Sequence, residues 1–427
     1  MSISTTRRAM FKAGLGAGAM LAGSSHFAPA RAEDVRLRMY WWGAQERNRR
    51  TLEVGAKYHE QNPDITMVGE SASADYWQKL VTMMAGRNIP DVFQLEPNTL
   101  ADYSKRGACA PLDGYIPSTL KITEFGDNLN LCKVNGKIYG VGLGLNSFAL
   151  VVDETAYAKA GVPIPNEATT WEQYAEGAIA ITKAANKPDF WGAPYGARYH
   201  NGLNVWLEQR GKRLYTAEGQ LGFDASDAAE WFEYWDKLAK AGGCVPADVQ
   251  AADHLDIDSS PLGQGKAASG LQYSNQLVGY QAQSKNKLSL TSYPKTKGAA
   301  LSGHFYRPAL IWSIAANSKY KDQAAQFISY FVTDPQAGAI LGVERGVPML
   351  PAIRKQIAPT LNAVEQATVD YVNNLATKVV PVPPVAPKGA SEFDRNVLRP
   401  ISDQVAFGKI SVAEAGKRLI SEGNAVM

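Results

Sequence analysis

The chain has 427 residues, with 44 Lys and Arg against 41 Asp and Glu, and a formal net charge of +3. Four of the basic residues and none of the acidic ones fall within residues 1–32, so the rest of the chain carries 40 basic and 41 acidic residues. A near-neutral chain argues against nucleic acids and anionic membrane surfaces as partners, because both require a basic patch. About 395 residues exceed what one hydrophobic core supports, so we expect two lobes.

Residues 1–32 have the features of an export signal. Arg7 and Arg8 precede a short apolar run over residues 13–23, and the small residues Ala30 and Ala32 predict cleavage there. The run is shorter than the roughly 20 residues that span a membrane. The paired arginines favour the twin-arginine pathway, and an ordinary Sec signal is the alternative. Ser24, and not a cysteine, directly follows the apolar run, so we expect a freely diffusing periplasmic protein without a lipid anchor.

Strand-like and helix-like patterns alternate along the rest of the chain. Strands are predicted over 35–42, 65–70 and 90–95, with helices over 51–61 and 76–85 between them. Further strands are predicted over 149–152, 268–271 and 288–293, and further helices over 171–185, 228–241, 321–333, 334–341, 364–375 and 412–420. A proline-rich connector covers 379–387. The alternation predicts an α/β fold with mostly parallel sheets flanked by helices.

Several motifs, taken in chain order, are shared with one protein family. They are YHEQNP at 58–63, a segment at 80–92 that ends in PDV, GKIYGVG at 136–142, TTWEQY at 169–174, GQGKAA at 263–268 and TDPQ at 333–336. In this order they resemble the periplasmic solute-binding proteins of carbohydrate ABC importers, the maltose-binding-protein-like class called extracellular solute-binding family 1. The resemblance covers nearly all of residues 35–357. The segment WWGAQER at 41–47 departs from the maltose type, so maltose is not implied as the ligand.

The resemblance implies a two-lobed periplasmic-binding-protein fold with the ligand cleft between the lobes. The expected lobes are residues 34–145 with 303–344, and residues 146–302 with 345–427. Such a protein captures a mono- or oligosaccharide, or a modified sugar, by hinge closure. As a monomer without a cofactor, it would then deliver the sugar to the permease subunits of an ABC importer in the inner membrane.

Polar side chains follow the first three predicted strands, where the ligand sites of open α/β sheets lie. Amides, hydroxyls and carboxylates bond sugar hydroxyls, which makes these residues candidate ligand contacts. The alternative is that loops are polar in any protein. Together with the end of the first strand and the first crossing between the expected lobes, the candidates are Trp42, Gly43, Gln45, Glu46, Ser71, Ser73, Gln94, Glu96, Asn98 and Asn146.

A sugar also requires flat aromatic faces against its C–H groups. We expect Trp206 to provide one such face from a loop over residues 199–206. The resemblance implies a second at Tyr273, with Asn275 in the same loop. Four other tryptophans stand at helical spacing and are expected to pack in the core: Trp77, Trp171, Trp231 and Trp235.

Two arginines bear on the charge of the ligand. Arg307 and Arg345 fall on segments that the resemblance implies lie near the hinge and the cleft. There they would bind the carboxylate, phosphate or sulfonate of an acidic sugar through paired hydrogen bonds. The alternative is that each holds a neighbouring carboxylate, which would leave a neutral sugar as the better expectation.

Signatures of catalysis and of metal binding are weak. The five histidines lack metal-ligand spacing, and no GxSxG elbow, P-loop or dinucleotide loop occurs. Cys109 and Cys132 either form a disulfide or remain buried thiols, and Cys244 has no obvious partner. We therefore predict a binding protein rather than an enzyme. The alternative is an exported carbohydrate-active enzyme, a lyase or a hydrolase, which would turn its ligand over.

Overall fold

The computed structural model describes residues 35–43, 45–72, 75–376, 378–383 and 386–427. The expected export signal at 1–32 and the candidate Ser73 lie outside the described residues. Residues Val35–Met427 form one compact unit. Within the described part of the chain, no helix is both long and apolar enough to cross a membrane.

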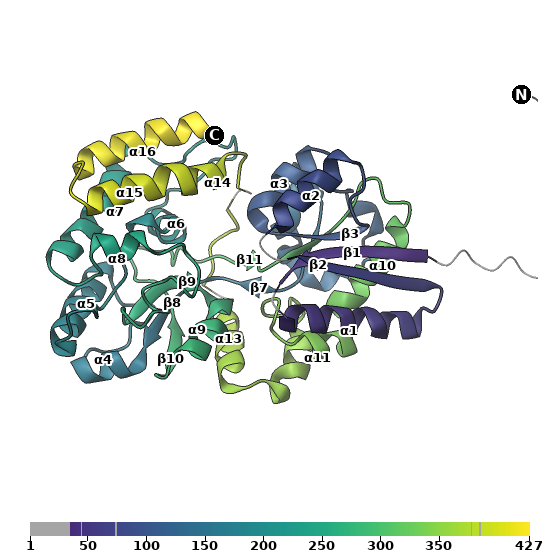
Figure 1. The fold of residues 1–427 in the computed structure, drawn as a ribbon, viewed down its shortest axis with the longest axis horizontal. Helices are drawn as coiled ribbons and strands as arrows, with labels where there is room; N and C mark the ends of the chain where they lie inside the picture. The colour runs from purple at the N-terminus through teal and green to yellow at the C-terminus, as the bar shows by residue number, and fades with distance from the viewer. Residues whose placement is uncertain (1–34, 44, 73–74, 377, 384–385) are drawn as a thin grey trace, which may run out of the picture. The chain divides into compact units, whose positions relative to one another are not determined.

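A five-stranded sheet, ordered β2-β1-β3-β12-β6, organises the first part of the fold (Figure 1). Its strands, in that order, are β2 (Ile65–Ala72), β1 (Val35–Trp42), β3 (Val92–Leu95), β12 (Ile311–Ile314) and β6 (Val141–Gly142). β1 runs parallel to both β2 and β3. The first half of β1 alternates arginines with the buried Leu37 and Met39, whereas Tyr40 and Trp41 are both buried. This change follows because a central strand is covered on both faces.

Helices pack around this sheet on both sides (Figure 1). They are α1 (Gln45–Gln61), α2 (Tyr76–Ala85), α3 (Pro97–Lys105), α10 (Lys321–Thr333), α11 (Pro335–Leu341) and α12 (Pro351–Ile357). Between α3 and β6 lie η1 (Asp113–Tyr115), η2 (Thr123–Cys132), β4 (Lys133–Val134) and β5 (Lys137–Ile138). The helix expected over 51–61 begins earlier, at Gln45. Its first turn is stabilised by ion pairs of Glu46 with Arg49 and Arg50, which an apolar pattern does not reveal.

A three-stranded sheet, ordered β10-β8-β9, organises the second part of the fold. Its strands are β10 (Leu288–Thr291), β8 (Phe148–Asp153) and β9 (Ser269–Tyr273). Both strand pairs are antiparallel, and β12 is also antiparallel to its neighbours β3 and β6. The expectation of parallel strands is therefore wrong for these pairs, although the mixed α/β character is confirmed. A parallel pair requires a crossover that returns the chain to the same end of the sheet, whereas the long segments that separate these strands in the sequence allow either direction.

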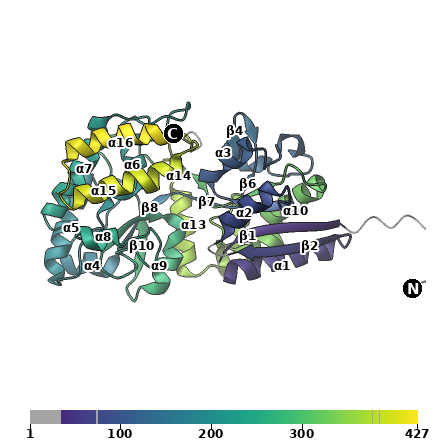
Figure 2. The ribbon, with the colours of Figure 1, turned by 45° about the horizontal axis from the view of Figure 1, so that its top comes forward.

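Helices flank the second sheet as well. They are α4 (Glu154–Ala160), α5 (Trp171–Ala185), α6 (His200–Glu208), α7 (Ala225–Lys240), α8 (Ala247–Ala251), α9 (Leu277–Gln283), α15 (Arg399–Ala406) and α16 (Val412–Val426), with the short turns η3 (Gly196–Arg198) and η4 (Ser274–Gln276). α5 has its predicted bounds because Thr170 and Gln173 form a capping box at its start, with bonds of 3.2 and 2.9 Å. Figures 1 and 2 both show α15 and α16 beside α7.

Two short strands carry the chain between the sheets. β7 (Leu145–Asn146) pairs antiparallel with β11 (Arg307–Pro308). Gly144 precedes β7 and allows a close approach of the backbone, because a Cβ at this position would lie 2.6 Å from the carbonyl oxygen of Arg345. The remaining helical segments are η5 (Ala358–Thr360), α13 (Ala363–Asn374), α14 (Ala390–Glu392) and η6 (Phe393–Leu398).

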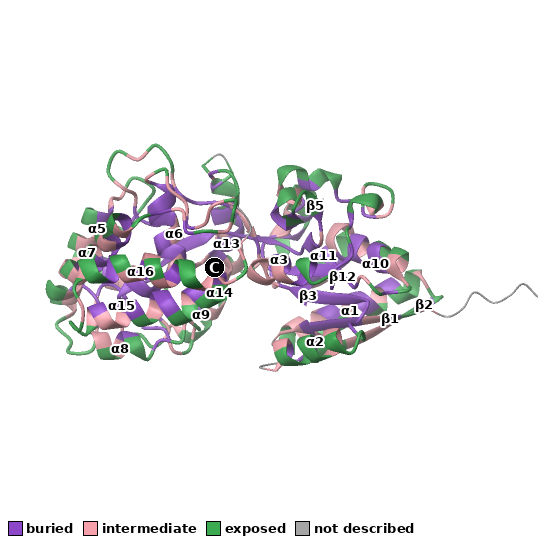
Figure 3. Ribbon diagram, turned by 90° about the horizontal axis from the view of Figure 1, so that it is seen from above, coloured by how far each residue is buried: buried purple, intermediate pink, exposed green. Residues whose placement is uncertain are grey.

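Buried apolar side chains form two main clusters, and Figure 3 shows the buried strands inside partly exposed helices. The first core surrounds the five-stranded sheet and draws on residues between 37 and 149 and between 310 and 375. The second core surrounds the three-stranded sheet and draws on residues between 148 and 305 and between 380 and 419. Packing of the C-terminal part is divided, since α12 and α13 join the first core while α15 and α16 join the second. The expected lobe boundaries stay a prediction.

Core packing also determines the roles of three tryptophans and the state of the three cysteines. Trp171, Trp231 and Trp235 are fully buried in the second core, which confirms their predicted packing role. The three cysteines, all within the described residues, are buried and free, so Cys109 and Cys132 form no disulfide. Burial raises the pKa of both thiols to about 12.

Candidate functional site

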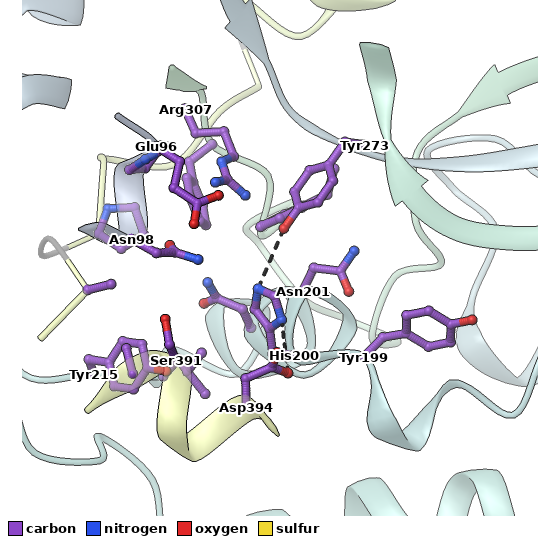
Figure 4. Close-up of a pocket in the computed structure, with 18 of the residues that line it drawn as sticks. Glu96, Asn98, Tyr199, His200, Asn201, Tyr215, Tyr273, Arg307, Ser391 and Asp394 are labelled. Carbon is purple, nitrogen blue, oxygen red and sulfur yellow. Dashed lines mark hydrogen bonds and ion pairs between the residues drawn. The ribbon is translucent and has the colours of Figure 1, made fainter. Parts of the chain in front are cut away.

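A cavity of about 350 Å³ draws its lining from both cores. Its walls include the ends of β3 and β9, strand β11, the start of α6 and the segment from α14 to α15 (Figure 4). These segments are separated by up to about three hundred positions in the sequence and meet only through the tertiary fold.

The residues that follow β3 form one side of the cavity. β3 is fully buried, and Glu96 then takes an extended backbone, with φ −113° and ψ 160°, before α3 begins. Glu96 and Asn98 consequently line the cavity (Figure 4). Burial raises the pKa of Glu96, while the charges of Arg307, Arg395 and His200 act in the opposite direction. The carboxyl group is therefore coupled to basic side chains on several elements.

Arg307 and Tyr273 form a stacked pair. The Cζ of Arg307, on β11, lies 4.6 Å from the ring centroid of Tyr273, at the end of β9. The Tyr273 ring packs in turn against Phe148, with centroids 5.4 Å apart. A guanidinium stacked on a ring keeps its in-plane N–H donors free for other acceptors. Burial raises the pKa of Tyr273, and the charge of Arg307 partly offsets this effect.

Asp394 is the centre of a charged cluster on the other side of the cavity. Its Oδ1 lies 3.3 Å from Nδ1 of His200, and its Oδ2 forms an ion pair with Arg399. Nε2 of His200 lies 3.5 Å from the Tyr273 hydroxyl, so the three side chains form a row (Figure 4). Burial alone would raise the pKa of Asp394, but the nearby His200 and Arg399, the latter through an ion pair and a hydrogen bond, together lower it to about 2. Asp394 is thus ionised at neutral pH, and Arg399 neutralises its charge.

Amide side chains on α6 complete this wall. Nδ2 of Asn201 donates to the Tyr293 hydroxyl at 2.8 Å and to the carbonyl of Leu271 at 3.3 Å, which fixes its orientation. Asn204 lies on the same polar stripe of the helix and also lines the cavity. Among the described residues, no donor forms a hydrogen bond with its buried Oδ1. A ligand hydroxyl could satisfy this acceptor.

The lining combines these polar groups with aromatic faces. Tyr199, Tyr215, Tyr273, Phe148 and Phe305 all contribute to it. Within the described ranges, no group of three or more His, Cys, Asp or Glu is arranged to hold a metal ion. The arrangement suits a small ligand that has apolar faces and several hydrogen-bonding groups.

Comparison with known proteins identifies the family of this chain. Residues 53–377 match the family model described as bacterial extracellular solute-binding protein. The chain belongs to this family. The resemblance inferred from the sequence motifs is confirmed, and the family description makes the chain an exported protein.

Solved structures of other solute-binding proteins share the fold. The extracellular solute-binding protein family 1 of Alicyclobacillus acidocaldarius is 28% identical, with a TM-score of 0.74 over 93% of this chain and 99% of that chain. A periplasmic oligogalacturonide binding protein from Yersinia enterocolitica, in complex with saturated digalacturonic acid, is 21% identical, with a TM-score of 0.79 over 92% and 98%. An uncharacterised lipoprotein of Streptomyces antibioticus is 23% identical over 92% of this chain and 87% of its own length. The structural likenesses confirm the predicted two-lobed α/β fold.

Four of the predicted contacts of this solute-binding protein are brought together in the cavity. They are Glu96, Asn98, Tyr273 and Arg307. The first two were predicted from their position after a strand, and the other two from the family resemblance. That they contact the ligand stays a prediction.

The other predicted contacts lie elsewhere in the described part of the chain. They are Trp42, Gly43, Gln45, Glu46, Ser71, Gln94, Asn146, Trp206, Asn275 and Arg345. Gln45 and Glu46 stand on the exposed first turn of α1 instead of in a loop. Trp42 packs against Trp77, with ring centroids 5.2 Å apart. Ser71 is exposed near the end of β2, and Asn146 donates to Oδ1 of Asn275 at 2.9 Å, which links β7 to η4.

The loop expected over residues 199–206 is wrong, because the segment forms α6. Trp206 is only 5% exposed, and its ring lies 5.4 Å from the rings of both Trp171 and Trp231. The Cζ of Arg210 lies 3.4 Å from the same ring centroid. Asparagine and glycine give the segment a low intrinsic helix propensity, which the burial of its apolar side chains overrides. Trp206 is therefore a core residue.

Arg345 is also buried away from the cavity, at 2% exposure. Its guanidinium donates to Oε1 of Gln94 and, at 2.7 Å, to Oγ1 of Thr51. Burial lowers the pKa of Arg345 to about 9. The adjacent Glu344 pairs with Arg47 instead, at 2.8 Å. Arg345 thus holds the end of β3 against α1 through neutral partners.

Several lining residues were not predicted from the sequence. They are His200, Asn201 and Asn204 on α6, and Ser391, Asp394, Arg395 and Arg399 near the C-terminus. A helical interpretation of 200–208 would have placed the first three on one polar stripe. The C-terminal residues carry no local signal, because their place depends on how this segment folds back onto the second core.

Proposed function

We propose that this protein is the substrate-binding component of an ABC importer and that it binds a sugar, either a mono- or oligosaccharide or a modified sugar. The observation that carries the proposal is the composition of the cavity, which offers aromatic faces together with amide and charged groups from both cores. We further propose that the protein is a periplasmic monomer and that it delivers its ligand to membrane permease subunits.

The chemistry of the cavity favours a carbohydrate. Sugar rings present C–H groups on their faces and hydroxyls around their edges, so they require flat apolar surfaces next to paired donors and acceptors. Tyr215 and Tyr199 supply aromatic surface, while Asn98, Asn204 and Glu96 supply amide and carboxyl groups. A volume of about 350 Å³ lies within the range of small-molecule sites, which is about 300–1,000 Å³.

Hinge closure would follow because the lining residues belong to two different cores. Glu96 and Asn98 extend from the five-stranded sheet, whereas Asn204 and Asp394 belong to elements of the second core. A ligand that bonds both sets stabilises the arrangement in which they are close together. Small-angle scattering tests this step, and a radius of gyration that does not change at saturation would contradict it.

A thermal-shift screen over neutral sugars, sugar acids and polyols tests the proposal, with calorimetry on each hit. Ligand at about 100 times its Kd should stabilise the protein by about 2.7 kcal/mol, with one site per chain. The ligand should be recovered chemically unchanged. If no carbohydrate in the panel binds, the proposed sugar specificity is wrong.

An exported carbohydrate-active enzyme is the second candidate, because Tyr273, His200 and Asp394 form a row of groups that could transfer a proton. Such an enzyme predicts product formation from a bound sugar. Replacing His200 with Ala would then abolish turnover while binding persists. The binding protein predicts that neither the parent nor the variant converts the ligand.

A further inference from the structure

We propose that the sugar carries a negative charge and that Arg307 and Arg395 bind its anionic group, a carboxylate, phosphate or sulfonate. This inference rests on the proposed function, because it concerns the ligand of the same cavity. Three observations support it: the balance of charges in the lining, the stacked position of Arg307, and the weakness of Glu96 as a counter-ion.

The charged lining residues contain more guanidinium groups than carboxylates. Three arginines, Arg307, Arg395 and Arg399, share the described lining with two acids, Glu96 and Asp394. Arg399 is already paired with Asp394. Even if Glu96 balanced one further arginine, the third would have no carboxylate partner in this part of the structure. Counted over its arginines and acids, the described lining has a formal charge of +1, and a monoanionic ligand would neutralise it.

Arg307 is positioned in advance to bind an anion. Its guanidinium lies over the Tyr273 ring, and it forms no ion pair with any carboxylate of the described residues. With no carboxylate partner among the described residues, its N–H donors are available to bind two oxygens of one anion. Arg395 is exposed on η6 and can approach the ligand from the second core.

Glu96 is the group that could instead balance Arg307 and leave a neutral sugar as the ligand. Burial raises the pKa of Glu96 in spite of the nearby arginines, which means that its ionised form is poorly stabilised. The charges of the nearby arginines therefore do not fully offset the burial of this carboxylate.

Matched sugar pairs test the inference. Titration calorimetry compares D-glucose with D-glucuronate and D-galactose with D-galacturonate, and D-glucose 6-phosphate and 6-deoxy-6-sulfo-D-glucose distinguish the three kinds of anion. At least one anionic sugar should bind about tenfold or more tightly than its neutral counterpart. Its affinity should fall as the NaCl concentration rises.

Variants connect this preference to the cavity. Arg307→Met should lower the affinity for the anionic sugar about tenfold or more and the affinity for its neutral counterpart no more than about threefold. Arg307→Lys should recover part of the lost affinity. Arg106→Met removes the same charge at a surface position, where Arg106 pairs with Asp102 at 2.9 Å, and should change neither affinity. Glu96→Gln should raise the affinity for the anionic sugar at pH 7, because it removes a competing negative charge from the cavity.

The outcomes separate this inference from the proposed function. If a neutral sugar binds as tightly as its anionic counterpart, the charge assignment is overturned while the proposed sugar-binding function stands. If no sugar binds, both fail. If Arg307→Met weakens both sugars equally while its melting temperature matches the parent, Arg307 binds hydroxyls and the assignment of the anion to Arg307 is wrong.

Discussion

Helix α6 carries two neighbouring residues whose replacement should have opposite effects. Trp206 packs in the second core at 5% exposure, whereas Asn204 lines the cavity. Trp206→Ala removes about 200 Å² of buried apolar surface, which is worth about 5 kcal/mol at 25 cal/mol per Å². Partial collapse of the surroundings reduces the expected loss of unfolding free energy to about 3–5 kcal/mol. Affinity for the sugar found in the screen should stay within about threefold of the parent.

Asn204→Ala should show the reverse. Its buried Oδ1 accepts no hydrogen bond within the described structure, so removing it should leave the unfolding free energy unchanged or raise it by up to about 1 kcal/mol. A ligand hydroxyl that donates to this oxygen would lose its partner, and affinity should fall about tenfold. Urea unfolding followed by circular dichroism measures the stability, and calorimetry measures the binding.

The two variants act as controls for each other, and Trp206→Phe provides a milder change if Trp206→Ala does not fold. A large loss of affinity in Trp206→Phe at unchanged stability would refute the assignment of Trp206 to the core. Normal binding by Asn204→Ala would refute the assignment of its amide to the ligand.

Three further predictions concern buried polar groups. The pKa of Asp394 falls from 3.8 to about 2 on folding, so its stabilising contribution of about 2 kcal/mol is present above pH 4 and is lost toward pH 2. The difference in unfolding free energy between the parent and Asp394→Asn should shrink over that window in urea titrations. Arg345→Met should lower the unfolding free energy by about 2 kcal/mol, because Gln94 and Thr51 lose a buried partner, while calorimetry should find ligand affinity within about threefold. The three buried cysteines should react with Ellman's reagent only after denaturation, and rapid labelling of the native protein would contradict their burial.

Local patterns predicted many of the elements well. α2, α5 and α10 have the bounds expected from the sequence, because apolar spacing acts within a few positions, and α5 also begins with a capping box. The helix at α6 was missed for the opposite reason. Its own residues have low helix propensity, and the aromatic core into which Trp206 packs is built from α5 and α7.

The site was predicted only in part. Glu96 and Asn98 could be inferred because they directly follow a strand, and the carboxyl ends of strands in α/β sheets gather ligand contacts. The same rule also selected Glu46 and Gln94. Glu46 instead pairs with Arg49 and Arg50. Gln94 instead accepts a hydrogen bond from the buried Arg345. Position after a strand identifies an edge of the sheet, and the direction of each side chain depends on what packs beside it.

The sequence by itself determined the α/β class, the family and the order of most elements, since these depend on periodicities and motifs that residues form with close neighbours. Tertiary structure decided the strand directions, the course of the C-terminal segment and the composition of the cavity. Asp394 meets His200, and Arg307 meets Tyr273, only after chain segments far apart in the sequence have folded together. Such contacts are set by the packing of two cores, which no local pattern records.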